Sequence, residues 1–315
     1  MKISIAMATY NGAKFISEQL ESFIRQIRLP DELVVTDDGS SDATLNILEG
    51  FGRRASFPVK IYRNAENLGY ARNFERAVSL CSGDLIFLSD QDDVWFPQKL
   101  ERTEEYFRAH PETQVVIHDA LLADERLNSF GHTQRKNIAK TANPNTNFFN
   151  GCCSAHRKSW HLLALPLPPG FAHDDWINGL AIEVGCAHQL DDILLAYRRH
   201  DRSSSDWFVS KPRGVTALRG LIGGLSDGRP GWTRHIKLLQ HAVSRLSERH
   251  DIAAAQGWKS ATDRIHCHIT ALERRIEICS RPRHRRVPKV LQFWLAGGYE
   301  RAAGVKSAIK DLIRP

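Results

Sequence analysis

The chain has 315 residues, of which 42% are hydrophobic and 25% charged, an ordinary globular composition that excludes disordered, collagen-like and low-complexity proteins. No stretch approaches the roughly 18 apolar residues of a membrane span, and residues 1–10 do not resemble a secretory signal. Six cysteines without a C-x-x-C pair indicate reduced thiols, so we expect a cytoplasmic protein.

Charge is distributed unevenly along the chain. Residues 211–315 contain 21 Lys and Arg against 8 Asp and Glu, whereas residues 1–210 contain 22 against 28. An acidic first part joined to a basic tail suggests two domains with different tasks, 1–210 and 211–315. The acidic first part argues against a nucleic-acid enzyme, whose catalytic part would usually be basic.

Residues 1–110 alternate between short apolar runs and helical patterns. The runs predict strands at residues 3–7, 33–35, 59–62 and 84–88. The helical patterns predict helices over residues 15–27, over residues that follow a Ser41 or Asp42 cap, and over residues 70–80. This alternation predicts an α/β fold with a mainly parallel, Rossmann-like sheet and helices on both faces.

The pattern loosens after residue 110. We expect strands at residues 115–118, 150–155 and 192–197, and a helix from His173 to about Val184. From Lys211 onward the sequence predicts a helical region with breaks at residues 223–224, 229–231 and 281–282.

Polar side chains follow three of the predicted strands. They are Thr9-Tyr10-Asn11, Asp37-Asp38 and Asp90-Gln91-Asp92-Asp93. In a parallel sheet the residues just past the carboxyl ends of the strands line the ligand crevice. The sequence therefore predicts one site where three strand ends converge.

The strongest motif is the acidic cluster after the fourth strand. Its three carboxylates, within four residues, repel one another unless a cation or solvent screens them. Divalent cations such as Mg²⁺ take oxygen ligands and typically keep one or two protein carboxylates plus phosphate oxygens. A solvated acidic turn is the alternative, but the position after a buried strand favours a metal site.

Four other side chains each have a functional and a structural interpretation. Asp38 can accept a hydrogen bond from a nucleobase or ribose, or belong to a turn and helix cap. Arg72, in the first turn of its helix, can contact a nucleotide or be a surface arginine. Asp174 can be a general base or a helix cap. His200 can be a metal ligand or structural.

These motifs together resemble glycosyltransferase family 2. They are Ala8-Thr9-Tyr10-Asn11-Gly12, Asp37-Asp38-Gly39-Ser40-Ser41-Asp42, Asn67-Leu68-Gly69 and Asp90-Gln91-Asp92-Asp93. Their order is that of inverting, GT-A-type nucleotide-sugar glycosyltransferases, and the resemblance covers about residues 1–205. Residues 87–95 and His173-Asp174-Asp175-Trp176 resemble bacterial rhamnosyltransferase-like members.

The resemblance implies roles for individual residues. Thr9, Tyr10, Asn11 and Asp38 would hold the donor nucleoside, with Asn67 and Arg72 nearby, and Asp90 would contact the ribose or donor sugar. Asp92 would ligate a divalent metal, Mg²⁺ or Mn²⁺, and His200 matches a position sometimes found at the metal or diphosphate. Asp174 corresponds to the catalytic base. Asp175 stands where relatives often have Trp, which leaves the base open between the two, with Asp174 favoured.

The implied activity is metal-dependent transfer of a sugar from dTDP-rhamnose or a UDP-sugar to a saccharide hydroxyl, in cell-surface polysaccharide synthesis. A sugar-1-phosphate nucleotidyltransferase is the enzymatic alternative, but Asn11-Gly12-Ala13-Lys14 is not the glycine-rich triphosphate loop that it would need. A non-enzymatic, basic nucleic-acid or membrane-binding protein would not explain the acidic clusters. The leading interpretation has no nucleic-acid partner.

The basic tail carries a second signal. Residues 281–286 contain four arginines directly before the apolar, Trp-bearing stretch 290–295, a combination that fits docking on an anionic membrane. The acceptor would then be a lipid-linked saccharide at the inner face of the cytoplasmic membrane. The alternative is a solvated helical domain whose apolar face packs internally or in a homo-oligomer.

Overall fold

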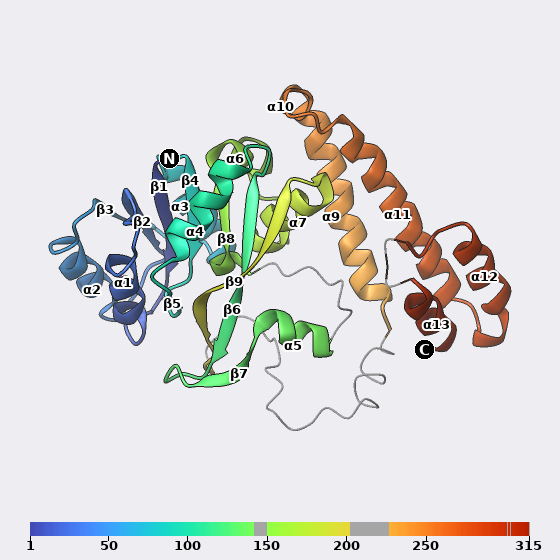
Figure 1. Cartoon of the computed structure of the whole chain (residues 1–315), viewed down its shortest axis with the longest axis horizontal. Coiled ribbons are helices and arrows are strands. Elements are labelled where there is room, and N and C mark those ends of the chain that lie inside the picture. The colour runs from blue at the N-terminus through green and yellow to red at the C-terminus, as the bar shows by residue number, and fades with distance from the viewer. Residues whose placement is uncertain (142–149, 202–226, 301, 303, 315) are drawn as a thin grey trace. The chain divides into compact units, whose positions relative to one another are not determined.

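The computed structural model describes residues 1–141, 150–201, 227–300, 302 and 304–314. Contacts divide the chain into two units, Met1–Gln134 with Phe148–Trp207, and Arg135–Asn147 with Phe208–Pro315. Each unit is described by itself (Figure 1). The division places residues 135–147 with the second unit, and the boundary expected at residue 210 stays a prediction.

Within the described residues, nine strands form one sheet in the first unit, in the order β3-β2-β1-β4-β8-β6-β9-β5, with β7 paired to β6. The strands are β1 (Ile3–Thr9), β2 (Glu32–Asp37), β3 (Val59–Arg63), β4 (Leu85–Ser89), β5 (Val94–Trp95), β6 (Val115–Ala123), β7 (Ser129–Thr133), β8 (Ser154–Arg157) and β9 (Ala187–Arg198). β1, β2, β3 and β4 pair in parallel. The predicted α/β class is confirmed.

The inner parallel strands β1, β2 and β4 are buried because both faces of the sheet are covered there, whereas the edge strand β3 is partly exposed. Ile5 and Ala6, neighbours on β1 that point to opposite faces, are both fully buried. Helix α3 (Tyr70–Leu80) covers one face and packs Phe74 and Ala77 against Ala6. Helix α1 (Ile16–Ile24) packs Phe23 against Trp95 of β5, with ring centroids 4.8 Å apart. The other early helices are α2 (Thr44–Gly52) and α4 (Lys99–Ala109).

The first unit differs from the sequence expectation in several details. Residues 151–153 form a 3-10 turn, so β8 begins only at Ser154, and β8 pairs antiparallel with β4 and β6. Strand β9 is longer than the predicted 192–197. The residue at the N-cap of α2 is Ala43 and not the predicted Ser41 or Asp42. The Asp42 side chain nevertheless accepts the Thr44 N–H at 3.0 Å. The remaining helices of this unit are α6 (Lys158–Ala164) and α7 (His173–Val184). Helix α5 (Gln134–Thr141) belongs, from Arg135 onward, to the second unit.

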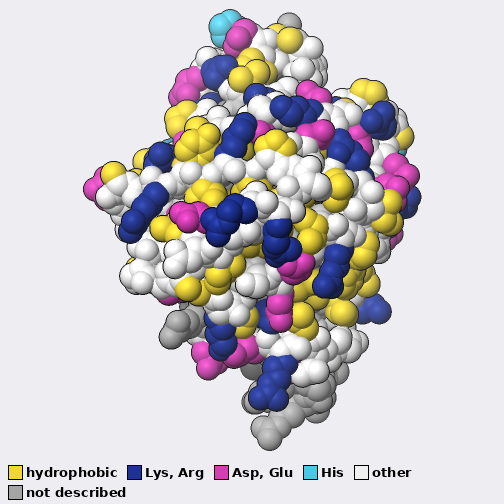
Figure 2. Space-filling model, turned by 90° about the vertical axis from the view of Figure 1, so that its left-hand side faces the viewer, with side chains coloured by type: hydrophobic (Ala, Val, Ile, Leu, Met, Phe, Trp, Pro, Cys, Tyr) yellow, Lys and Arg dark blue, Asp and Glu magenta, His cyan; other side chains and the backbone are white. Residues whose placement is uncertain are grey.

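The surface of the face drawn in Figure 2 is chemically mixed. Lys and Arg side chains are interspersed there with Asp, Glu and apolar side chains. Opposite charges that alternate over a surface attract and screen one another, so this pattern is typical of a solvated surface.

The second unit is helical where it is described, as the sequence predicts. Its helices are α9 (Arg229–Glu248), α10 (His250–Ala255), α11 (Lys259–Cys279), α12 (Val287–Leu295) and α13 (Val305–Ile313). The break expected at residues 229–231 is instead the start of α9, because Pro230 is tolerated in a first turn. The break expected at residues 223–224 lies outside the described residues. Among the described helices, none is long and apolar enough to cross a membrane.

Candidate active site

The candidate site is a cavity of about 550 Å³ in the first unit, at the carboxyl ends of the parallel strands. From β1 the sheet continues on one side to β2 and on the other to β4. This is the kind of switch point at which open α/β sheets bind ligands. The lining residues are Ala8, Thr9, Tyr10, Asn11, Gly12, Lys14, Phe15, Asp38, Asn67, Gly69, Tyr70, Asn73, Phe74, Asp90, Gln91, Asp92, Tyr197, Arg198 and His200.

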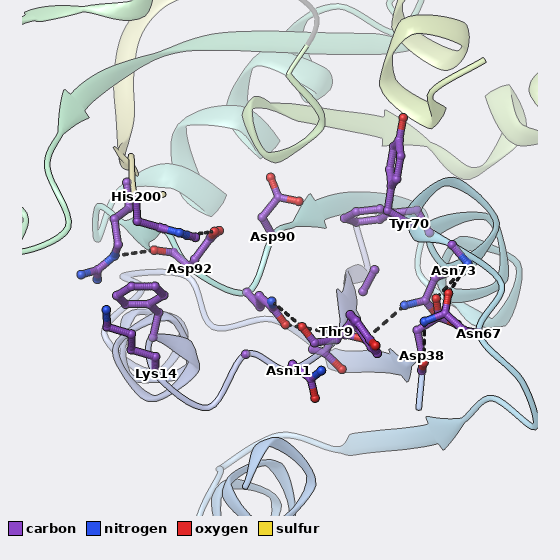
Figure 3. Close-up of a pocket in the computed structure, with 18 of the residues that line it drawn as sticks. Thr9, Asn11, Lys14, Asp38, Asn67, Tyr70, Asn73, Asp90, Asp92 and His200 are labelled. Atoms are coloured by element: carbon purple, nitrogen blue, oxygen red, sulfur yellow. Dashed lines mark hydrogen bonds and ion pairs between the residues drawn. The ribbon is translucent and has the colours of Figure 1, made fainter. Parts of the chain in front are cut away.

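One end of the cavity is organised around Asp38, which follows β2 and is 3% exposed. Its Oδ1 accepts the Leu68 N–H at 2.8 Å and its Oδ2 accepts the Gly69 N–H at 2.9 Å. Gly69 has a φ of +76° directly before α3, a conformation that L side chains rarely adopt. The amide of Asn67 donates to the Asp38 carbonyl at 3.0 Å. These bonds hold the start of α3 against the end of β2 (Figure 3).

The loop after β1 forms the floor between the two ends. The Gln91 side chain accepts the Tyr10 N–H at 2.9 Å and donates to the Tyr10 carbonyl at 3.0 Å. Asn11 has a φ of +48°, and its side-chain oxygen accepts the Ser41 N–H at 2.9 Å. The Tyr10 ring is 51% exposed. An exposed aromatic ring beside a polar loop provides a surface on which a nucleobase can stack.

The other end of the cavity is acidic. The Asp92 carboxylate lies 2.8 Å from Nε2 of His200, whose ring packs against Phe15 at a centroid distance of 4.7 Å. Figure 3 shows Asp92 and His200 together at the side opposite Asp38 and Asn67, with Asp90 between the two groups. The cavity therefore has one end suited to a nucleoside and one suited to a cation with its phosphates.

Asp93 has a different place from its neighbour Asp92. It is fully buried, and its Oδ1 accepts the Arg198 N–H at 3.0 Å. The Arg198 guanidinium donates to the Asp92 carbonyl at 2.7 Å and pairs with Glu18. Asp93 and Arg198 thus attach the acidic loop to the end of β9. The guanidinium N–H groups of Arg198 named here donate to protein groups.

Burial and crowding of the carboxylates alter their protonation. Burial, together with the negative charges of Asp92 and Asp174, raises the pKa of Asp90 to about 7. Burial, together with the negative charges of Asp92 and Asp90, raises the pKa of Asp93 well above its usual range. Lys99 is also fully buried, and its Nζ donates to the Cys152 carbonyl at 2.6 Å. A divalent cation would relieve this crowding of negative charge.

Asp174 lies in the first turn of α7, held by the turn that precedes β8. Its Oδ2 accepts the Gly151 N–H at 3.1 Å, and its Oδ1 accepts the Asp175 N–H at 3.0 Å. A Cβ at residue 151 would lie 2.5 Å from Nε2 of His173, so only glycine permits this approach. The carboxylate is therefore held in one orientation and remains close enough to Asp90 to influence its pKa.

The structure brings most of the sequence-predicted residues together. The lining of the cavity includes Thr9, Tyr10, Asn11, Asp38, Asn67, Asp90, Asp92 and His200. Arg72 is not in the lining, and its guanidinium pairs with Glu75 on the same helix. Asp174 and Asp175 are also outside the lining.

The polar lining residues that sequence reasoning did not single out include Lys14, Tyr70 and Asn73. Gln91, which the sequence placed in the predicted site as part of the acidic motif, is in the lining. Tyr70 and Asn73 occupy the first turn of α3, which the Asn67-Leu68-Gly69 motif precedes. No local pattern distinguishes Lys14 from a surface lysine.

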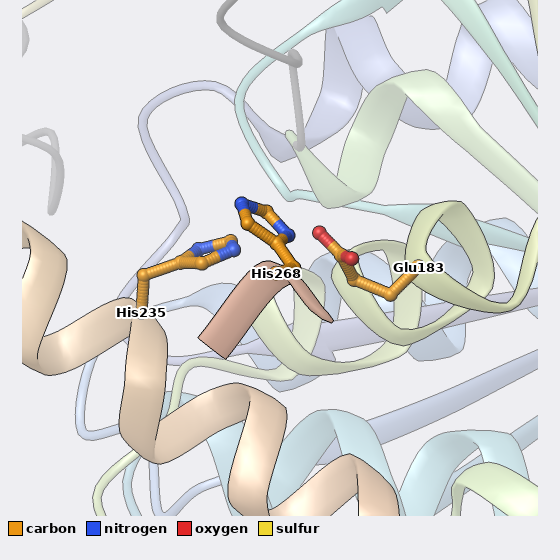
Figure 4. Close-up of side chains that lie close together, drawn as sticks. All are labelled: Glu183, His235 and His268. Atoms are coloured by element: carbon orange, nitrogen blue, oxygen red, sulfur yellow. The ribbon is translucent and has the colours of Figure 1, made fainter. Parts of the chain in front are cut away.

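Two histidines lie close together in the second unit. Figure 4 labels Glu183, which belongs to the first unit, and His235 and His268, which belong to the second. Within the second unit the two imidazole rings are 5.0 Å apart, on α9 and α11. Two imidazoles are fewer than the three or four protein ligands of a typical zinc site, so we assign no function to this pair.

Comparison with solved structures identifies the class of fold. The structure of S. aureus TarS residues 1–349 in complex with UDP superposes with a TM-score of 0.57 at 16% identity, covering 99% of this chain and 80% of TarS. The mannosyltransferase PcManGT from Pyrobaculum calidifontis, in complex with GDP-Man and Mn²⁺, superposes with a TM-score of 0.52 at 15% identity. The match covers 98% of this chain and 84% of the PcManGT chain. The fold is thus of the GT-A type.

Sequence comparison then identifies the family. The family described as Glycosyl transferase family 2 matches residues 4–162, half of the chain, so the chain belongs to glycosyltransferase family 2. A curated relative, the dTDP-rhamnosyl transferase RfbG of Shigella flexneri, is 34% identical over 148 residues, 45% of this chain and 48% of RfbG. The chain spans less than half the length of this and other curated relatives that it matches.

Family membership confirms the resemblance that the motifs indicated. Membership of this family favours the transferase interpretation over the nucleotidyltransferase and the non-enzymatic alternatives. The matched region ends at residue 162 and so contains the Asp38 and Asp92 motifs but neither Asp174 nor His200. The roles of these individual residues remain predictions.

Proposed function

We propose that this glycosyltransferase uses a divalent cation and a nucleoside-diphosphate sugar, dTDP-rhamnose or a UDP-sugar, to glycosylate a saccharide hydroxyl with inversion. The observation that carries the proposal is the two-ended cavity, with Asp38 and Asn67 at one end and Asp92 and His200 at the other. Its volume of about 550 Å³ lies within the usual range for a small-molecule site.

The nucleoside would occupy the end formed by Thr9, Tyr10, Asn11, Asp38 and Asn67. Oδ1 of Asp38 accepts hydrogen bonds from Asn64 and from the Leu68 N–H, whereas Oδ2 accepts the Gly69 N–H. Since a carboxylate oxygen can accept two hydrogen bonds, Oδ2 has capacity for a donor on a base or ribose. The name of the relative RfbG, a dTDP-rhamnosyl transferase, supports a dTDP-sugar. The UDP in the TarS structure supports a UDP-sugar. Asp90, between the two ends, would contact the ribose or the sugar.

The residues at the acidic end fit a divalent cation. Asp92 offers a carboxylate and His200 an imidazole nitrogen, 2.8 Å apart, and Mg²⁺ and Mn²⁺ both accept oxygen ligands. Among the described residues, oxygen or sulfur atoms of Asp90, Asp93 and Cys152 also lie within 4.8 Å of one another. A cation held by Asp92 and His200 would supply charge neutralisation for the leaving diphosphate.

The protein's own part in the reaction is to position the acceptor and to remove its proton. We assign that proton to the carboxylate of Asp174, which two backbone N–H groups hold in place. The acceptor oxygen, losing its proton to Asp174, forms a bond to the anomeric carbon. The bond between that carbon and the diphosphate oxygen breaks, and the nucleoside diphosphate leaves with the electron pair. Attack opposite the leaving group inverts the anomeric centre.

Paired substitutions test the assignment of the base. Asp174→Asn keeps the size of the side chain and one carbonyl oxygen, but cannot accept the proton, so we expect transfer to fall by about 10²–10⁴-fold. Asp175→Asn is the matched control on the adjacent residue, and we expect it to retain most activity. Nucleoside-diphosphate binding, measured by calorimetry, should be unchanged in both. Near wild-type transfer by the Asp174 variant would show that the base lies elsewhere.

The acceptor that we propose is a lipid-linked saccharide of cell-surface polysaccharide synthesis. The support comes from the basic, Trp-bearing tail, because an enzyme that acts on a membrane-anchored acceptor gains from residence at the same surface. Transfer to a lipid-linked acceptor in vesicles should therefore exceed transfer to the same saccharide in solution. Equal rates would argue for a soluble acceptor.

A further inference from the structure

Helix α12 exposes an unusually apolar face. Its outward side chains are Val287, Leu291, Trp294 and Leu295, which are 57%, 49%, 46% and 76% exposed. Their spacing of four, seven and eight residues places them on one face of the helix. Single exposed apolar side chains are common, but a contiguous group with a Trp marks a surface that binds something.

The opposite face of α12 is anchored in the core of the second unit. Val290 is 5% exposed and packs in a cluster with Ile278, Tyr299 and Ala308. The ring of Phe293 meets that of Tyr299 at a centroid distance of 4.9 Å. Since these contacts fix the helix, the outward face is held in position and is not simply an unfolded apolar segment.

The residues around this face are basic. Residues 280–314 contain nine Lys and Arg against two Asp and Glu. One of the two acids, Asp311, is fully buried between Arg275 and Arg314, so its charge does not balance the surface. Arg283 and Arg285, in the turn before α12, are exposed. Helix α13 repeats the pattern, with Val305 and Ile309 exposed by 53% and 52%.

We propose that the outward face of α12 docks on an anionic lipid surface. A Trp and large aliphatic side chains enter the boundary between headgroups and acyl chains, while neighbouring arginines and lysines attract anionic headgroups. Charge decides against a second copy of this chain as the occupant. A symmetric contact would bring two equally basic surfaces together, whereas anionic lipid neutralises them. The docking needs neither donor nor acceptor, so it stands apart from the proposed reaction.

Vesicle flotation of the full chain tests this proposal. We expect the chain to float with vesicles of 70% phosphatidylcholine and 30% phosphatidylglycerol, and not with phosphatidylcholine alone. The triple variant Leu291→Ser, Trp294→Ser, Leu295→Ser should lose flotation. Leu162→Ser is the matched control, because Leu162 is 57% exposed but lies on α6 of the first unit.

A charge variant distinguishes electrostatic attraction to anionic lipid from nonspecific hydrophobic adsorption. Arg285→Gln combined with Lys289→Gln should weaken binding roughly 30-fold, since each basic residue near an anionic membrane contributes about fivefold. Circular dichroism should show that every variant keeps its helical content. Flotation that is equal with neutral vesicles, or absent with both, would overturn the proposal. So would a dimer in sedimentation analysis that the triple variant abolishes, because a second copy would then occupy the face.

Discussion

A buried histidine offers a quantitative test of the first unit. His161, on α6, is 8% exposed, and within the described part of the chain neither ring nitrogen has a hydrogen-bond partner. Its ring meets that of His156 edge-on at a centroid distance of 5.2 Å. Burial, with a smaller effect of the charge on His156, lowers the pKa of His161 well below 6.5. The folded chain thus keeps this ring neutral where the unfolded chain would protonate it.

The sign and size of the effect follow from proton linkage. Because the pKa of His161 is lower in the folded chain, the unfolded chain binds more protons below pH 6.5, and stability falls as the pH falls. At pH 5, about 1.5 units below the ordinary value of 6.5, the loss is about 2 kcal/mol at 1.36 kcal/mol per unit. His161→Leu removes the titrating group, so it should remove this loss and leave other groups' contributions unchanged.

Urea unfolding followed by tryptophan fluorescence measures the effect, because Trp160 and Trp176 are buried in the same unit. The free energy of unfolding of His161→Leu minus that of the wild type should be about 2 kcal/mol larger at pH 5 than at pH 7. His284→Gln, at an exposed position, is the control and should show no such change. An equal difference at both pH values would refute the burial argument.

Three further substitutions test individual contacts. In the wild type the Asp38 carboxylate accepts the Gly69 N–H. Asp38→Asn would bring an amide NH₂ against a backbone N–H in place of one carboxylate oxygen, and should lower the free energy of unfolding by about 1–3 kcal/mol in urea titration. Asp311→Asn leaves the buried Arg275 and the partly buried Arg314 without their shared counter-charge and should cost about 3–5 kcal/mol. Glu277→Gln, in an exposed pair, should cost nothing measurable. Gly151→Ala places a Cβ 2.5 Å from the His173 ring, so transfer should fall in a radiolabelled-sugar assay while nucleotide binding persists.

Much of the fold could be predicted because local pattern and tertiary environment agree. Helix α3 spans Tyr70–Leu80 and α7 spans His173–Val184, as the periodicity of apolar residues and the flanking glycines indicate. The inner parallel strands β1 and β4 are nearly continuous apolar runs because both sheet faces are covered there. Their shared direction also explains why three polar strand ends, far apart in the sequence, meet at one cavity.

Other features depend on contacts that no local pattern encodes. Strand β8 lies between β4 and β6, two strands that precede it in the sequence with helices and loops between them, and only packing determines this order. Asp92 and Asp93 are adjacent and chemically identical. Asp92 nevertheless lines the cavity, whereas Asp93 accepts a hydrogen bond from the backbone of β9, because the chain turns between them. The position of Arg72 in the first turn of α3 predicts contact with a ligand. In the structure its guanidinium instead forms an ion pair with Glu75, three residues further along the same helix.

The most direct test of the central claim is a thermal-shift titration of the wild type and Asp92→Ala with dTDP, UDP and GDP, each with and without Mn²⁺. If Asp38 and Asp92 mark the two ends of one donor site, one diphosphate should stabilise the wild type only when Mn²⁺ is present. At about 100 times its dissociation constant the gain should be about 2.7 kcal/mol. The Asp92 variant should lose the metal-dependent part. Stabilisation by none of the three diphosphates, or an equal metal-dependent gain in Asp92→Ala, would contradict the account.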